Sequence, residues 1–196
     1  MRKPPTTRLS RFLARFLRED RGVTAVEFGL ICIPLMLMTF GLLELALVFL
    51  ATSTLDTAME TSSRQIRTGE FQTSAANTQA DFKNLVCSNM AWLQNRCAAD
   101  LWVDVRTFST FSALAANTQP NPTTFDPTKA GATCFTAGNP TDIVLVRVFF
   151  EWSLYTPLLN NALENMGSGS GKRLLTSTTA FRNEPYNTSP PIGTSC

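Results

Sequence analysis

The sequence predicts an α+β protein in which one long N-terminal helix packs on a small head with an antiparallel sheet. Two patterns along the chain support this fold class. An apolar stretch runs from Arg21 to Ala51, and a helical apolar stripe continues from it to about Thr68. Further along, three segments have the alternation or the β-branched and aromatic content that is typical of strands.

The first 22 residues differ in charge from the rest of the chain. They hold seven Lys and Arg residues against only Glu19 and Asp20, whereas the remainder is weakly acidic. Apolar residues between Leu9 and Leu17 fall at helical spacing opposite the arginines, which favours a basic amphipathic helix on an anionic membrane over a solvated tail. Basic residues beside a span stay in the cytoplasm, so we expect the C-terminal part to be exported.

Residues 23–51 are expected to form a transmembrane helix. No charged residue occurs from Phe28 to Leu43, and the whole stretch is long enough to cross a hydrocarbon core of about 30 Å. A plain anchor would gain nothing from Glu27 one turn inside the membrane, and an unpaired carboxylate there is costly. Glu44 lies about 32 Å along the helix from Val23, at the outer headgroup region, where it either snorkels to the interface or contacts a partner helix.

Residues 52–196 are expected to form the exported head, including the second half of the long helix. That helical stripe comprises Leu55, Ala58, Met59, Ser62 and Ile66, and Gly69 is the predicted stop. A capping pattern at Thr78 to Asp81 predicts a second helix that ends near Leu93.

Strands are predicted at Leu101–Phe108, Ile143–Trp152 and Arg173–Arg182. We expect a long surface loop from Asn117 to Pro140 and a short helix over Pro157 to Asn165. Gly171-Lys172 is not a phosphate-binding loop, because Met166 and Arg173 replace the Gly and the Ser or Thr that such a loop needs.

The cysteines agree with an exported head. Cys32 lies in the apolar stretch, where it is simply a small apolar residue, and four more cysteines lie beyond it. We expect Cys87–Cys97 and Cys134–Cys196 disulfides, although four cysteines allow three connectivities. Ten residues of continuous helix would separate Cys87 from Cys97 by about 15 Å, so this pairing requires a fold-back at Gln94 to Arg96.

The sequence holds no histidine, which excludes His-based acid–base catalysis and the commonest zinc ligand sets. No catalytic group, metal site, cofactor or nucleic-acid interface is predicted, and we expect the protein not to be an enzyme.

The segment Gly22-Val23-Thr24-Ala25-Val26-Glu27-Phe28 resembles the processing motif of type IV prepilins. With Ile33-Pro34 and Leu43-Glu44, the longer string from Arg21 to Glu44 is similar to the TadE-like family, pilin-like proteins of the tight-adherence (Tad) pilus system. Three strings of the head also resemble that family: Leu101 to Arg106, Asp142 to Val148, and Phe181 to Pro185. The Asn183-Glu184-Pro185 ending favours this family over its TadF-like sister.

The resemblance implies a minor pilin-like subunit of the bacterial inner membrane, with a cytoplasmic N-terminus and a periplasmic head. A prepilin peptidase would cut between Gly22 and Val23 and so remove the leader, residues 1–22. Glu27 and Phe28, with Glu44, would then serve assembly with other Tad pilins, including TadF-like subunits and the major Flp pilin, on the Tad inner-membrane platform. Adhesion and biofilm formation are the implied downstream roles. The alternative is an unprocessed, membrane-anchored periplasmic binding or sensor domain.

Overall fold

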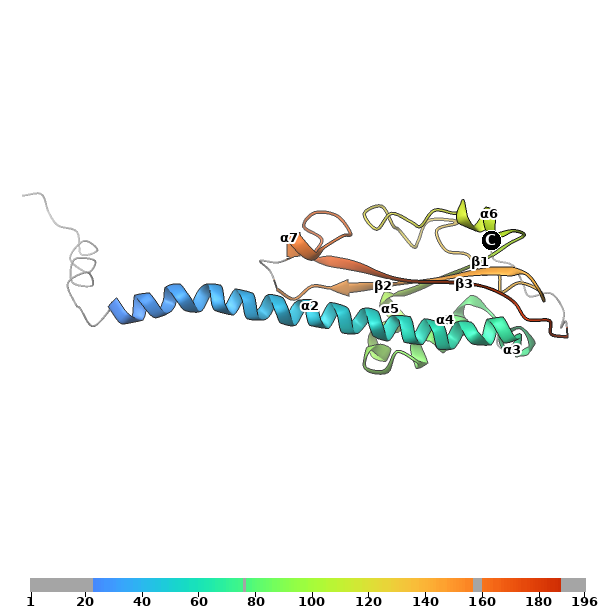
Figure 1. Ribbon diagram of the computed structural model, residues 1–196, viewed down its shortest axis with the longest axis horizontal. Coiled ribbons are helices and arrows are strands. Elements are labelled where there is room, and N and C mark those ends of the chain that lie inside the picture. Colours follow the sequence, from blue (N-terminus) through green and yellow to red (C-terminus); the bar gives the residue numbers. More distant parts are fainter. Residues whose placement is uncertain (1–22, 76, 157–159, 188–196) are drawn as a thin grey trace, which may run out of the picture. The chain divides into compact units, whose positions relative to one another are not determined.

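A computed structural model describes residues 23–75, 77–156 and 160–187 (Figure 1). The chain divides into two compact units, Met1–Leu43 and Glu44–Cys196. The leader, Gly22 and Cys196 lie outside the described residues, so the predictions made for them are not tested.

The long helix α2 spans Val23–Thr68 and continues through Pro34. It ends where predicted, because Gly69 adopts a left-handed conformation with φ of 82° that suits glycine better than residues with a Cβ atom. Within the second unit, the predicted apolar stripe of α2 is buried: Leu55, Ala58, Met59, Ser62 and Ile66 are each at most 3% exposed. This confirms that the second half of the helix forms one wall of the head.

The sheet has three antiparallel strands in the order β1 (Leu101–Phe108), β2 (Ile143–Ser153) and β3 (Lys172–Arg182). The helical wall covers one face of this sheet, and the segment between β1 and β2 lies over the other (Figure 1). Alternate residues of β2 explain the two faces: Val146, Val148 and Phe150 join the core with α2, whereas Arg147 and Phe149 point the other way. The predicted α+β class is therefore confirmed.

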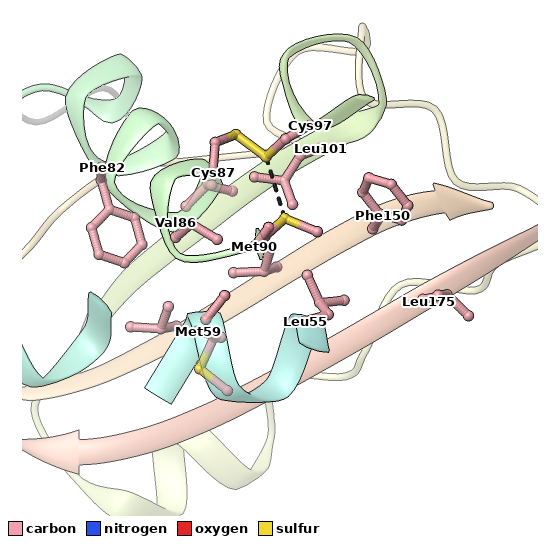
Figure 2. Packing of buried hydrophobic residues seen from close by; sticks show 14 of the residues in the cluster. Leu55, Met59, Phe82, Val86, Cys87, Met90, Cys97, Leu101, Phe150 and Leu175 are labelled. Carbon is pink, nitrogen blue, oxygen red and sulfur yellow. Dashed lines mark hydrogen bonds between the residues drawn. A yellow bond between two sulfur atoms is a disulfide. The ribbon is translucent and has the colours of Figure 1, made fainter. Parts of the chain in front are cut away.

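Several short helices complete the core on the side of α2. They are α3 (Glu70–Thr73), α4 (Gln79–Ser88), the 3-10 turn η2 (Ala91–Leu93) and α5 (Gln94–Asp100). Figure 2 shows Phe82, Val86 and Met90 packed against Leu55 and Met59 of the long helix. The predicted capping box is present, since the Thr78 side chain and Asp81 exchange hydrogen bonds with each other's backbone.

The predicted end of the second helix is wrong. It stops at Ser88 rather than near Leu93, and Gln94 to Arg96 are helical instead of folding back. The reversal takes place at Asn89 to Ala91, where Ala91 has a φ of 45°. A positive φ is uncommon for alanine, so the sequence carries no signature of this turn.

The segment from Asn117 to Pro140 is a surface loop only in part. A short helix α6 (Phe111–Ala115) precedes this segment. The later residues of the segment turn into the head, where Cys134, Phe135 and Ala137 are buried. Backbone hydrogen bonds between Val105 and the stretch Cys134–Thr136 fix it along the free edge of β1. Of the predicted helix over Pro157 to Asn165, the structure forms α7 over Asn160–Leu163, and residues 157–159 lie outside the described part.

Candidate functional site

The apolar half of α2 is exposed over the whole described part of the first unit. Phe28, Leu30 and Ile31 are each more than 60% exposed, and the other exposed large hydrophobic side chains up to Leu43 range from 36% to 70%. Such a surface is stable only against lipid or against other apolar helices. The helix is long and apolar enough to cross a membrane.

Glu27 is the one acidic residue between Val23 and Leu43, and its side chain is exposed among these apolar neighbours. Its position four residues after Val23 places both residues on the same face of the helix. In lipid, a carboxylate at this point needs a cationic or hydrogen-bonding partner.

Glu44 opens the second unit and is only 2% exposed. Its Oε2 accepts hydrogen bonds from the backbone N–H of Tyr155 and the hydroxyl of Thr156, each at 3.1 Å, in the loop that follows β2. Its Oε1 has no hydrogen-bond partner among the described residues. One oxygen of Glu44 is thus used inside its own subunit, a contact that sequence reasoning did not anticipate.

The outer face of the sheet carries a buried ionic network. Asp104 of β1 is directly opposite Arg147 of β2, which donates to it from Nε at 2.9 Å and from Nη2 at 2.6 Å. Asp104 also accepts hydrogen bonds from Arg106 Nε and from the backbone N–H of Cys134. The carboxylate is therefore fully satisfied, as a buried charge must be.

Above this network lies a hollow of about 500 Å³ between the sheet and the loop before β2. Arg106, Arg147, Asn117 and Phe125 are among its lining residues. Both arginines donate to the one carboxylate of Asp104 and to loop carbonyl groups, so two guanidinium charges share a single carboxylate. The described residues contain no cluster of metal-ligating side chains.

Comparison with known protein families gives a match in the N-terminal part of the chain. Residues 22–64 match the family model of the TadE-like proteins. The resemblance inferred from the sequence is confirmed for this segment. The matched residues include Gly22, the exposed apolar half of α2 with Glu27, and most of the amphipathic half, which includes Glu44. Comparison with curated proteins and with solved structures finds no match. TadE-like proteins are structural components of Tad pili.

The TadE-like match ends before the sheet. The three head segments whose sequences resemble the family nevertheless form several contacts of the folded head. Asp104 and Arg147 come from two of these strings and form the buried ion pair. The third string closes the end of α2: Glu184 pairs with Arg67 at 3.0 Å, and its N–H bonds to the Arg67 carbonyl. Asn183, which is only 2% exposed, donates to the carbonyls of Ala137 and Asn139. These residues hold the strands, the segment before β2 and the end of α2 together.

A disulfide joins Cys87 and Cys97, with the Cα atoms 5.5 Å apart, which is the pairing favoured from the sequence. Figure 2 shows it above the core, with the Met90 sulfur 3.3 Å from Cys97 Sγ. The early end of α4 and the turn at Ala91 bring the two cysteines together. The predicted Cys134–Cys196 pair stays a prediction, because Cys196 lies outside the described residues.

Proposed function

We propose that this chain is a minor pilin-like subunit of a Tad-type pilus, anchored in the bacterial inner membrane by α2 with its head in the periplasm. The observation that carries the proposal is that the TadE-like match at residues 22–64 includes the exposed apolar part of α2, whose single acid up to Leu43 is Glu27. A prepilin peptidase removes residues 1–22 by cutting between Gly22 and Val23. The subunit then joins or primes a pilus whose downstream roles are adhesion and biofilm formation.

Glu27 is the docking residue of this proposal. Cleavage creates a charged α-amino group on Val23 at the start of a helix that packs among other helices. A carboxylate on the same helical face offsets that charge within one subunit, and in the assembled pilus it pairs with the amine of a neighbour. Phe28 beside it supplies apolar contact to the same neighbours. The partners are the other Tad pilins, namely TadF-like subunits and the major Flp pilin, and the Tad inner-membrane platform.

Cleavage and docking require different residues, so mutation should separate them. Gly22→Arg places a bulky charge at the cut and should leave a full-length, membrane-bound chain. Glu27→Val should still mature to a Val23 amino terminus but fail to support pili. Amino-terminal sequencing of membrane-extracted protein measures the first effect, and counting pili in a strain without the wild-type copy measures the second. Normal piliation with Glu27→Val would remove Glu27 from this role.

Glu44 is proposed to contact a partner subunit through Oε1, the oxygen that its own chain leaves without a described partner. Glu44→Gln keeps the shape and an acceptor for the Tyr155 N–H but removes the charge. We expect weaker co-purification with other pilins. If the variant co-purifies and assembles as the wild type does, the contact with a partner is wrong and Glu44 serves its own head alone.

The second candidate is an unprocessed, membrane-anchored binding or sensor domain, and the hollow above Asp104 and Arg147 is the observation in its favour. The same sequencing experiment separates the two candidates. An intact Met1 on the membrane-extracted chain supports the anchored domain, whereas a chain that begins at Val23 supports the pilin-like subunit.

A further inference from the structure

The hollow above Asp104 carries an excess of positive charge. Among the described residues, its charged lining consists of Arg106, Arg147, Lys129 and Asp126. Lys129 and Asp126 lie 4.0 Å apart and compensate each other. The two arginines share the single carboxylate of Asp104, so one positive charge at the hollow is left unbalanced.

The alternation of the strands brings this charge to one face of the sheet. Asp104 and Arg106 are two residues apart in β1, so their side chains lie on the same face, and Arg147 of β2 is directly opposite Asp104. A guanidinium group keeps its proton at physiological pH, so deprotonation cannot remove the excess charge. The residues of this unit outside the described part, 76, 157–159 and 188–196, include no Asp or Glu. An anion from another molecule is therefore what would balance the hollow.

The guanidinium groups keep donors for such an anion. Arg106 donates from Nε to Asp104 and from Nη2 to the Gly131 carbonyl, while its Nη1 donates to no acceptor among the described residues. The Arg106 side chain is 26% exposed, so a ligand can reach it. Arg147 is only 4% exposed and is held by Asp104 and the Thr118 carbonyl, so it contributes its charge from a fixed position.

The rest of the lining offers one more polar group and an aromatic surface. Asn117 precedes Thr118, and its buried Oδ1 has no hydrogen-bond partner in the described part of the chain. An asparagine amide can present either its oxygen or its NH₂ group by a half-turn, so Asn117 can donate to an anion. Phe125 also lines the hollow, and its ring packs on Phe149 with the centroids 4.5 Å apart.

We propose that the hollow binds a small-molecule carboxylate whose apolar or aromatic part lies against Phe125. Its volume of about 500 Å³ is within the range of small-molecule sites. An excess of one charge favours a carboxylate over a phosphate monoester, which carries about −1.5 to −2 at neutral pH. The planar carboxylate also matches the planar N–H groups of a guanidinium.

This proposal does not depend on the membrane helix or on cleavage after Gly22, because every residue that it uses belongs to the unit Glu44–Cys196. It gives the second candidate function a ligand class and is equally compatible with a pilin-like subunit. Amino-terminal sequencing decides between those two candidates, whereas ligand binding decides this proposal. The failure of one is therefore distinguishable from the failure of the other.

Thermal unfolding of the full chain in an uncharged detergent at low salt tests the binding. Sodium phenylacetate should raise the unfolding midpoint as its concentration increases, because a ligand that binds only the folded state stabilises it. Phenylacetamide has nearly the same shape without the charge and should leave the midpoint unchanged. Equilibrium dialysis with labelled phenylacetate gives the dissociation constant for each variant.

The first variant removes the unbalanced charge. Arg106→Gln leaves the Asp104–Arg147 pair in place and should weaken phenylacetate binding about tenfold or more, the loss expected for a charged hydrogen bond. The matched control is Arg182→Gln, because the Arg182 guanidinium lies over the Phe111 ring and is not part of the lining. This control should bind phenylacetate as the wild type does.

The second variant supplies the missing anion from the chain itself. Asn117→Asp should abolish phenylacetate binding and raise the unfolding midpoint in the absence of ligand. In a hollow without excess positive charge, a new buried carboxylate would instead lower the midpoint. Near-ultraviolet circular dichroism and an intact Cys87–Cys97 peptide show that each variant is folded.

The remaining outcomes each overturn a part of the proposal. If phenylacetate neither shifts the midpoint nor is retained in dialysis, the hollow is not a carboxylate site. Equal binding of phenylacetamide means that the ring alone is recognised, and tighter binding of phenyl phosphate means that the ligand class is wrong. Unchanged binding by Arg106→Gln, or an equal loss in Arg182→Gln, overturns the role of the shared guanidinium charge.

Discussion

The close contact between Gly69 and Tyr186 provides a quantitative test of how the end of α2 is fixed to the head. A Cβ atom at Gly69 would overlap the Tyr186 ring, and the φ of 82° is unfavourable for alanine. Gly131 has nearly the same φ, 78°, but nothing lies within 4 Å of a Cβ atom there. Gly131→Ala therefore measures the conformational cost alone, and Gly69→Ala measures that cost together with the displacement of the ring.

The two costs can be estimated separately. The left-handed conformation costs alanine about 1–2 kcal/mol. Displacing the Tyr186 ring adds an overpacking cost of about 1–3 kcal/mol, and the hydrogen bond from its hydroxyl to the Gly138 carbonyl is lost as well. Gly69→Ala should thus lower the free energy of unfolding by roughly 2–5 kcal/mol, against about 1–2 kcal/mol for Gly131→Ala.

Thermal unfolding of the full chain in detergent, followed by tryptophan fluorescence, measures the difference, since 1 kcal/mol corresponds to roughly 2–4 °C for a chain of this size. Tyr186→Ala should abolish the extra cost of Gly69→Ala in a double-mutant cycle. Equal midpoints for Gly69→Ala and Gly131→Ala would refute the reasoning. So would additive effects in the cycle, because the ring would then not be what the new Cβ atom meets.

Three further predictions concern carboxylates of the head, each measured by the same unfolding assay. Asp104→Leu should lower the free energy of unfolding by about 3–5 kcal/mol, because it leaves Arg147 buried and unpaired. Adding Arg147→Met should recover most of that loss. If no stability is recovered, the broken ion pair is not the cause of the loss. Backbone N–H groups of the glycine-rich turn before β3 lower the pKa of Glu164. The stabilising effect of the Glu164 carboxylate is therefore present above the ordinary carboxyl pKa and is lost as the pH falls through the lowered value. Glu164→Gln should flatten this acid dependence of the unfolding midpoint, and an unchanged pH profile would contradict the prediction. Glu44→Val should destabilise the head by about 1–3 kcal/mol because the Tyr155 N–H and Thr156 hydroxyl lose their acceptor, whereas Glu27→Val, in the other unit, should leave the midpoint unchanged.

The elements that the sequence predicted well are those with a long periodic signal. The apolar and amphipathic halves of α2 extend over 46 residues, and the β-branched run of β2 favours a strand over other structures. The Gly69 stop and the Thr78 capping box were predictable because each depends on the chemistry of one or two residues. Local signals of this kind are independent of what the rest of the chain does.

The elements that were missed depend on tertiary contacts. Nothing local distinguishes Ala91 as the site of a chain reversal, since the disulfide and the core impose its conformation. The pairing of Asp104 with Arg147 depends on strand register, which sequence alternation leaves open by any even number of residues. The burial of Phe135 likewise depends on the edge of β1 that its segment happens to pair with.

The two acids of α2 illustrate how differently one helix can use the same side chain. Glu44 comes at the residue where the second unit begins, and its own head supplies two donors for one of its oxygens. Its burial is thereby partly compensated before any partner is present. Glu27 is exposed on the apolar half, and no hydrogen bond or ion pair joins it to another described residue. In a membrane an unpaired carboxylate is costly, so Glu27 gains from a partner outside its own helix. The amine that a cut before Val23 would create is a cation on the same helical face. This is why we assign docking first to Glu27, and to Glu44 only through its second oxygen.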